Sequence, residues 1–242
     1  PCPSCRFCSC AHRFLLRHSL IGDAMNDLIK VDRATKVIKG RTVLDDVSLE
    51  LRRGGIYGFS GVNGSGKTML FRAISGLIHL TSGSVEVFGQ RVGVDVDFPS
   101  DMGIVLGSSG FMDEKTGRRN LEMLASIRGV IGLPEVDDIM RRVGLDPGDD
   151  RPFSAYSLGM RQRLSIAQAV MERPQLLILD EPTNALDVDG VGMVIELLLD
   201  ERGRGATILV ASHNEPAIES LCDKQFRMAG GRVVEEAEGN ES

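Results

Sequence analysis

A glycine-rich run in the first third of the chain holds the residue types that bind a polyphosphate. It fits the spacing G-x-x-x-x-G-K-[ST] and consists of Gly61-Val62-Asn63-Gly64-Ser65-Gly66-Lys67-Thr68. Glycines let the backbone approach phosphates and direct its N–H groups at them, and a helix that starts here adds its partial positive charge. Lys67 would reach the β- and γ-phosphates, and the Thr68 hydroxyl would bind Mg²⁺. The alternative is a glycine-rich turn that binds nothing.

Two acids supply the second part that such a site needs. Asp180 and Glu181 directly follow an apolar run at 176–179, where a strand buried on both faces would end. Ligands of α/β proteins bind beyond the carboxyl ends of strands. We therefore expect Asp180 to hold the metal and Glu181 to orient or deprotonate an attacking water. The alternative is that both acids only cap a helix before Pro182.

The elements that must position these residues alternate between strands and helices. The glycine-rich run lies between a predicted strand at 56–60 and a predicted helix at 68–77. Further strands are expected at 43–44, 47–51, 84–88, 102–106, 175–179 and 206–211, and further helices at 120–128, 135–143, 158–171 and 190–201. This order predicts an α/β fold with a mainly parallel sheet and a helical insertion at about 107–171.

Composition narrows the classes of function. The 242 residues carry a formal net charge of −6, so the surface as a whole repels a nucleic-acid backbone and no nucleic-acid partner is expected. The longest purely aliphatic run, at 176–179, is only long enough for a strand, so we expect no membrane-spanning helix.

The first 24 residues differ from the rest. Four of the five cysteines lie there, at Cys2, Cys5, Cys8 and Cys10. Their spacing would suit Zn²⁺ or part of a cluster, but four ligands so close together leave little chain for a surrounding shell. We expect residues 1–24 to be a disordered or non-native extension, and residues 25–242 to form a single domain.

Three further motifs, in the same order, resemble those of the nucleotide-binding domain of ATP-binding cassette (ABC) transporters over residues 28–235. The signature motif would be Ser157, Leu158, Gly159 and Met160, preceded by Tyr156. It departs from the common LSGGQ form at three positions but keeps a hydroxyl and a backbone N–H at a helix start. Residues 184–187 resemble the D-loop, which ends at Asp187, and His213 matches the switch histidine. Without the family, Ser157 would be an ordinary helix cap and His213 a structural residue.

The resemblance implies a P-loop NTPase core with an N-terminal antiparallel β subdomain and a helical insertion. It implies an ATPase in which ATP and Mg²⁺ lie between the glycine-rich loop of one subunit and Ser157 and Gly159 of another. His213 would contact the γ-phosphate and hold the water and Glu181 in place. A separate membrane permease would receive the motion and keep the protein at the cytoplasmic face of the membrane.

Two positions depart from the family pattern. Gly107 stands where a glutamine or glutamate is usual, so coupling to the permease is altered or Ser108 or Ser109 substitutes through water. The usual adenine-stacking aromatic is replaced by Ile38 or Val37, which predicts weak selectivity between ATP and GTP.

Residues 110–121 and 157–163 resemble the ATPase subunits of bacterial ABC-2-type exporters of antibiotics and drugs. We therefore expect a subunit that drives export of an unknown substrate. An importer ATPase shares every catalytic residue, and a non-transport ABC ATPase or a P-loop kinase or GTPase is a further alternative. Arg161 and Arg163 are interpreted as a solvated helix face.

Overall fold

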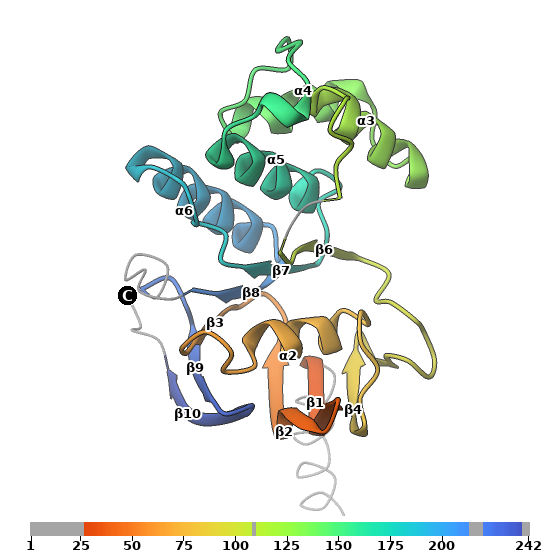
Figure 1. Ribbon diagram of the computed structural model, residues 1–242, viewed down its shortest axis with the longest axis vertical. Coiled ribbons are helices and arrows are strands. Elements are labelled where there is room, and N and C mark those ends of the chain that lie inside the picture. The colour runs from red at the N-terminus through yellow and green to blue at the C-terminus, as the bar shows by residue number, and fades with distance from the viewer. Residues whose placement is uncertain (1–26, 108–109, 213–219, 239–242) are drawn as a thin grey trace, which may run out of the picture.

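The computed structural model describes residues 27–107, 110–212 and 220–238 (Figure 1). The strands are β1 (Asp27–Ile38), β2 (Arg41–Arg52), β3 (Ile56–Ser60), β4 (Ser82–Val87), β5 (Gln90–Arg91), β6 (Met102–Val105), β7 (Leu176–Asp180), β8 (Thr207–Ala211), β9 (Lys224–Ala229) and β10 (Arg232–Glu238). The helices are α2 (Lys67–Ile74), α3 (Gly117–Arg128), α4 (Leu133–Arg142), the short 3₁₀ helix η1 (Phe153–Ala155), α5 (Leu158–Val170) and α6 (Val188–Gly203). The 1–24 extension with its four cysteines, Ser108, Ser109 and His213 lie outside the described residues.

The strands form two sheets. One is antiparallel, in the order β2-β1-β4-β5, and the other has the order β10-β9-β3-β8-β7-β6. In the second sheet every neighbouring pair from β9 to β6 is parallel, and only β10 pairs antiparallel. The predicted α/β fold, with an antiparallel N-terminal sheet and a mainly parallel core, is confirmed.

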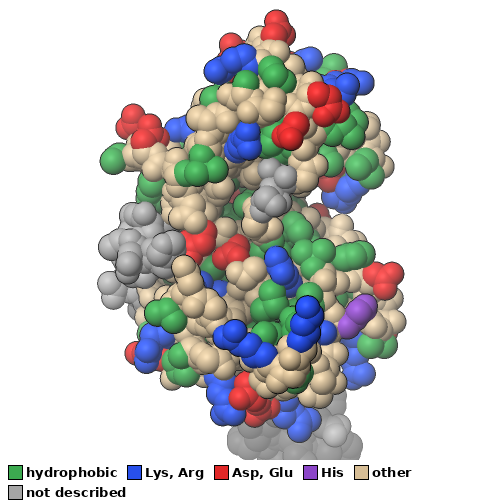
Figure 2. Space-filling view, in the orientation of Figure 1, with side chains coloured by type: hydrophobic (Ala, Val, Ile, Leu, Met, Phe, Trp, Pro, Cys, Tyr) green, Lys and Arg blue, Asp and Glu red, His purple; other side chains and the backbone are tan. Residues whose placement is uncertain are grey.

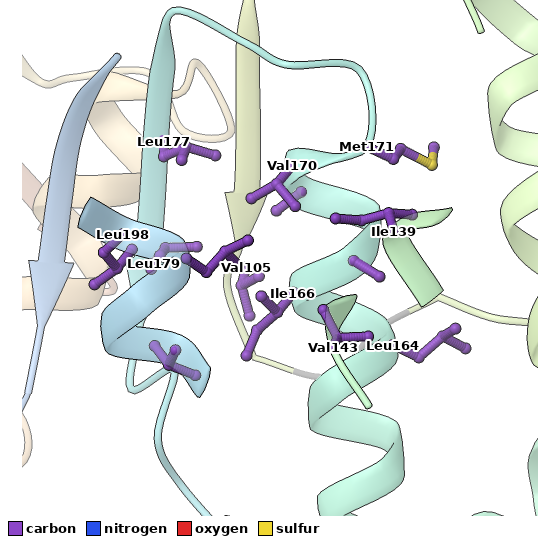
Figure 3. Packing of buried hydrophobic residues seen from close by; sticks show 14 of the residues in the cluster. Val105, Ile139, Val143, Leu164, Ile166, Val170, Met171, Leu177, Leu179 and Leu198 are labelled. Carbon is purple, nitrogen blue, oxygen red and sulfur yellow. The ribbon is translucent and has the colours of Figure 1, made fainter. Parts of the chain in front are cut away.

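Strand β7 is buried on both faces because its side chains alternate between two cores. Leu176 and Ile178 pack with α2 and the antiparallel sheet, whereas Leu177 and Leu179 pack with α5 and α6. Figure 3 shows the second set, where Leu177 and Leu179 lie beside Val170 and Leu198. Burial on both faces explains why this strand is a continuous aliphatic run, and it holds Asp180 rigidly at the strand's end.

Helices α3, α4 and α5 lie together at one end of the molecule, away from the antiparallel sheet (Figure 1). Their starts follow ordinary capping rules: Thr116 accepts a hydrogen bond from the N–H of Arg119, so α3 begins three residues before its predicted start. These helices fall within the interval 107–171. Among the described residues, no helix is long and apolar enough to span a bilayer.

Sequence reasoning misjudged β2 and missed the β9–β10 hairpin. The predicted short strands at 43–44 and 47–51 form one strand, because Asp46 is accommodated with a φ of 53° rather than ending the strand. The Asp46 N–H donates a hydrogen bond to the Thr35 hydroxyl of β1 at 3.1 Å. Strand β10 is mostly exposed and rich in glutamate, a poor strand former, but it pairs with β9 and forms cross-strand ion pairs such as Lys224–Glu236.

Candidate active site

The glycine-rich loop connects the end of β3 to the start of α2, as the sequence predicts. Two glycines are required by geometry. Gly61 has a φ of +143°, and a Cβ there would lie 2.4 Å from the carbonyl oxygen of Met228. Gly66 has a φ of +114°, and a Cβ there would lie 3.1 Å from Gly231. Any larger side chain at either position would therefore push the loop away from β9 and the β9–β10 turn.

The N-terminus of α2 is prepared for an anion. No side chain caps it, so its first N–H groups point into the loop. Lys67 is only 6% exposed, and its ammonium group donates to the Gly61 carbonyl at 2.5 Å. The hydroxyl of Ser65, a residue 2% exposed, is buried without a hydrogen-bond partner among the described residues. A buried polar group without a partner is costly, and a phosphate oxygen in the loop would satisfy it.

Thr68 and Asp180 meet at the opening of this loop. The Thr68 hydroxyl donates to Asp180 Oδ2 at 2.5 Å, joining the first turn of α2 to the end of β7. Burial raises the pKa of the Asp180 carboxyl above its usual value, against the opposing effect of the Thr68 hydrogen bond. A hydroxyl and a carboxylate are oxygen ligands of the kind that Mg²⁺ prefers, so these two residues fit that ion.

Glu181 directly follows Asp180 and has an unusual backbone conformation. Its φ is +53°, in the left-handed region that glutamate rarely adopts. The Glu181 N–H donates to the Ala211 carbonyl of β8 at 2.9 Å. The Glu181 carbonyl accepts from the side-chain amide of Gln162, on α5, at 3.2 Å. Glu181, the acid predicted to act on the attacking water, is therefore held on both sides through its main chain.

The loop and both acids line a cleft of about 440 Å³. The other lining residues come from α2, β2 and the β9–β10 turn, namely Met69, Arg41, Thr42, Val43, Gly230 and Gly231. Neither Ile38 nor Val37 is among the lining residues, and Ile38 is 39% exposed at the end of β1. The role of Ile38 as the base platform stays a prediction, and Val43 and Met69 are the larger apolar residues that line this cleft.

Sequence reasoning missed the β9–β10 turn as part of the site. The Gly231 N–H donates to the Ser65 carbonyl at 2.8 Å, and the Asp45 N–H of β2 donates to the Gly231 carbonyl at 2.9 Å. An ion pair between Arg232 and Asp45, at 2.8 Å, reinforces the contact. The signal was present, because two adjacent glycines between alternating apolar residues predict a hairpin.

The signature residues lie at the start of α5. The Ser157 hydroxyl accepts from the Met160 N–H at 3.2 Å, so Ser157 is a helix cap, as its alternative interpretation required. Leu158 is 71% exposed, Ser157 is also exposed, and Gly159 and Met160 are half-buried. Among the described residues, no signature residue lines the cleft that holds the glycine-rich loop.

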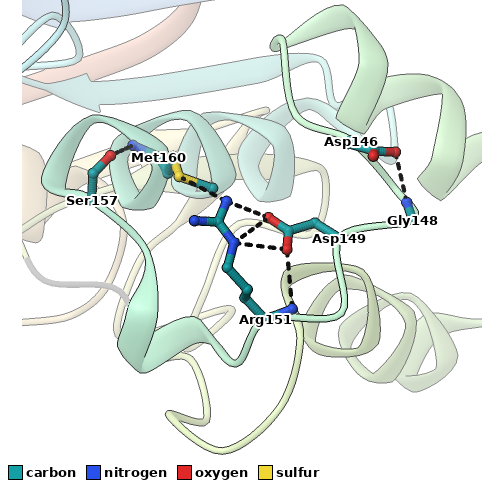
Figure 4. Close-up of polar contacts among 6 residues, drawn as sticks. All are labelled: Asp146, Gly148, Asp149, Arg151, Ser157 and Met160. Carbon is teal, nitrogen blue, oxygen red and sulfur yellow. Dashed lines mark hydrogen bonds and ion pairs between the residues drawn. The ribbon is translucent and has the colours of Figure 1, made fainter.

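Arg151 braces the loop that precedes this helix (Figure 4). Its guanidinium donates to both carboxylate oxygens of Asp149, at 2.8 to 3.2 Å, and lies 3.8 Å from the sulfur of Met160. The hydrogen bonds from Arg151 lower the pKa of the Asp149 carboxyl. Asp149 and Arg151 thus keep the loop in contact with the signature helix.

Arg161 and Arg163 correct a prediction, because neither simply faces solvent. The Arg161 guanidinium donates to the carbonyls of Tyr156 and Ser154 and lies over the Phe153 ring. Arg163 donates to the Val143 carbonyl at 2.9 Å and to Asp187 at 3.2 Å. The partners of Arg161 lie within eight residues of it in the chain, whereas those of Arg163 are twenty or more residues away and are brought close by the tertiary fold.

Asp187 lies at the start of α6, and Gly107 lies shortly after the end of β6. Asp187 caps α6, because its carboxylate accepts from the Gly190 N–H at 3.0 Å. Gly107 follows β6 with a φ of +74°, and a Cβ there would meet nothing within 4 Å. A larger side chain would fit in the space but would be strained in that conformation.

A glycine-rich loop between β3 and α2, a buried lysine and a threonine–aspartate pair at the end of a neighbouring strand define a P-loop nucleoside triphosphatase. A family model described as "ABC transporter" matches residues 44–184. The chain is 44% identical to an uncharacterized ABC transporter ATP-binding protein, YybJ, of Bacillus subtilis over 85% of this chain and 94% of that one. It is 37% identical to the bacitracin transport ATP-binding protein BcrA of Enterococcus faecalis, over 88% and 70% of the two chains.

Among solved structures, a dimeric ATP-binding cassette in a post-hydrolysis state, bound to ADP and Pi, superposes with a TM-score of 0.80. It covers 89% of this chain and 100% of its own at 21% identity, which supports the fold alone. The chain belongs to the ABC transporter family. The predictions of an ATP-binding domain and of ATPase activity are confirmed at that level.

Proposed function

We propose that this chain is the ATP-hydrolysing subunit of an exporter, working as a dimer beneath a separate membrane permease. One observation carries the proposal: the cleft assembles the phosphate-binding half of an ATPase site, while no signature residue lines it and the first two, Ser157 and Leu158, are exposed. The cleft would need signature residues and the signature residues would need a cleft, and a second subunit of the same kind supplies one of each.

Within the cleft, the residues divide the work. The N–H groups at the start of α2, Lys67 and the Ser65 hydroxyl would hold the β- and γ-phosphates. Thr68 and Asp180 would hold Mg²⁺, which when bound neutralises charge on the phosphates. Glu181 orients or deprotonates the attacking water. We assign the second catalytic role to His213, which follows Ser212 directly in the chain.

The second subunit would place Ser157 and Gly159 against the γ-phosphate in the first subunit's cleft. Helix α5 begins at this point, so its N-terminal N–H groups favour an anion. The dimeric cassette among the solved relatives is consistent with this arrangement.

A permease partner is supported by apolar side chains between the helical end and the body. On the face in Figure 2, hydrophobic side chains gather in the hollow between these two parts. Exposed apolar residues on the flanking segments include Leu77, Phe98 and Met112. A partner that covers them would keep the protein at the cytoplasmic face of the membrane and receive motion of the 107–171 region.

Export is favoured over import by the relatives. BcrA bears the name of a bacitracin transport protein, and the segments at 110–121 and 157–163 resemble those of antibiotic exporters. Tagged protein purified from membranes should carry a multi-span permease. A solute-binding protein encoded or purified with it would favour an importer instead.

Glu181→Gln tests the ATPase assignment. The variant should bind ATP with near-normal affinity, accumulate an ATP-bound dimer on size exclusion, and lose at least about a hundredfold in turnover. Glu196→Gln, which removes the same charge from an exposed position on α6, is the control and should behave as wild type. Near-normal turnover of Glu181→Gln, or a specific activity that stays constant on dilution without a detectable dimer, would contradict the proposal.

A further inference from the structure

The first turns of α5 contact the segment that follows β7 at several points. The Gln162 side-chain amide donates to two successive carbonyls, of Glu181 at 3.2 Å and of Pro182 at 3.0 Å. A Cβ at Gly159 would lie 3.0 Å from the Ala185 carbonyl oxygen. Arg163 pairs with Asp187 at 3.2 Å. The signature helix and the segment that carries the catalytic acid are therefore joined along their length.

Gln162 contacts the residue of this segment that has an unfavourable backbone conformation. Glu181 has a φ of +53°, and a non-glycine residue stays in this region only where its surroundings hold it. The Ala211 carbonyl binds the Glu181 N–H on one side, and Gln162 binds the Glu181 carbonyl on the other. The Glu181 carbonyl also accepts from the Asn184 N–H at 3.2 Å, within the same segment. Removing the amide would therefore remove the hydrogen bond that ties this carbonyl to α5 and leave only the bond within the segment.

We propose that Gln162 is a positioning residue for the Glu181 carboxylate, and that α5 thereby links the two ATP sites of the dimer. The inference rests on the proposed function. At its start, α5 presents Ser157 to the partner's nucleotide, and five residues later Gln162 holds the catalytic acid of its own subunit. At a rise of about 1.5 Å per residue, these two points are about 7.5 Å apart on one rigid element.

This arrangement makes the geometry of Glu181 depend on whether the partner's nucleotide is engaged. A shift of α5 on closure moves Gln162, and the two carbonyls that it holds move with it. Each site is then set for hydrolysis by the occupancy of the other. Arg163 carries the same shift to Asp187, at the start of α6.

Gln162→Met tests the positioning role in the full-length chain, because methionine keeps the length of the side chain but cannot donate. We expect kcat for ATP to fall about tenfold while the Kd for ATP, measured by calorimetry, stays within about twofold. Gln162→Lys keeps a donor of similar reach and should recover most of the lost turnover. Gln168→Met, a half-buried glutamine on the same helix for which no hydrogen bond is observed, is the matched control and should retain wild-type kcat.

Cooperativity tests the link between sites. The wild-type rate should rise with ATP concentration with a Hill coefficient above one, and the coefficient of Gln162→Met should approach one. Wild-type kcat in Gln162→Met, an equal loss in Gln168→Met, or no recovery in Gln162→Lys would overturn the positioning role. A wild-type coefficient of one, or an unchanged coefficient in Gln162→Met, would overturn the link. A wild-type chain without ATPase activity would instead refute the proposed function itself.

Discussion

The nucleotide cleft and the signature end of α5 are built in opposite ways. In the cleft the functional groups are buried or half-buried and already bonded to one another: Lys67 binds Gly61, and Thr68 binds Asp180. At the signature end, Ser157 is exposed, Leu158 is 71% exposed, and Gly159 is half-buried. The groups of the cleft are held by contacts within their own chain, whereas Ser157 and Leu158 face solvent at the start of α5.

This difference is what the proposed dimer requires, because each chain would then carry two halves of a site that only a second subunit completes. Preorganised donors in the cleft need no rearrangement to hold phosphates, so nucleotide binding should be a property of the single subunit. Hydrolysis should instead depend on a second subunit that brings its signature residues to the cleft. Substitutions in the cleft and at the signature end should therefore separate nucleotide binding from hydrolysis.

Lys67→Ala should give the largest effect, because it removes a buried cation from the cleft. We expect ATP binding to become undetectable at micromolar nucleotide and hydrolysis to fall by about a thousandfold. Lys115→Ala, which removes an exposed lysine, is the control. Tight ATP binding by Lys67→Ala, in calorimetry or with a fluorescent analogue, would mean that the cleft is not the binding half.

Ser157→Asp should stop hydrolysis without preventing binding. Aspartate caps a helix as well as serine does, so α5 should stay intact, but its charge would repel a γ-phosphate. We expect an unchanged ATP Kd at subunit concentrations too low for dimers, and turnover about a hundredfold lower. Thr116→Asp makes the same change at the cap of α3 and should leave turnover unchanged. An equal loss of turnover in both variants would mean that Ser157 serves only as a helix cap.

Gly231→Asn tests whether the β9–β10 turn belongs to the binding half. Asparagine tolerates the φ of +83°, but its Cβ would lie 2.9 Å from the Val43 carbonyl oxygen. The turn should shift from Ser65 and weaken ATP binding about fivefold, or about 1 kcal/mol. Gly89→Asn, between β4 and β5 and outside the cleft, with a φ of +78° and nothing within 4 Å of an added Cβ, is the control and should bind ATP normally. Equal affinities for the two variants would remove the turn from the site.

The smallest expected effect is on stability in acid, where the helical end formed by α3, α4 and α5 and the cleft should respond oppositely. In the helical end, the hydrogen bond from Arg118 lowers the pKa of the Asp137 carboxyl. The stability that this pair contributes is therefore present above the usual pKa of aspartate. It is lost as pH falls through the lowered pKa. Burial raises the pKa of Asp180 in the cleft, so protonation there favours the folded state, and this contribution is lost as pH rises through the raised value.

Asp137→Asn should therefore lower the melting temperature slightly at neutral pH and less at about pH 3, where the wild-type pair is already weakened. Thermal melts followed by circular dichroism across this range measure the difference. Asp138→Asn, on the same helix, is the control. A loss that grows toward acid pH would contradict the assigned direction of the Asp137 pKa shift.

Local patterns predicted most of the fold and the cleft. The run from Gly61 to Thr68 and the acids at Asp180 and Glu181 are contiguous motifs beside strongly patterned strands, so their placement follows from a few residues. The β9–β10 turn, Gln162 and Arg163 were not predicted as parts of the site. Their contacts join segments that are distant in the sequence, and nothing in the neighbouring residues specifies the partner.

The sequence by itself determined which groups are expected to bind phosphate, which acids follow the buried strand, and the family to which these motifs belong. Only the tertiary structure decided how those groups are held. It places Gly231 against the loop at Ser65, anchors Glu181 through Gln162, and leaves Ser157 and Leu158 exposed at the start of α5. The physical reason is that residue type and spacing encode local conformation, whereas packing between distant segments depends on how the whole chain folds.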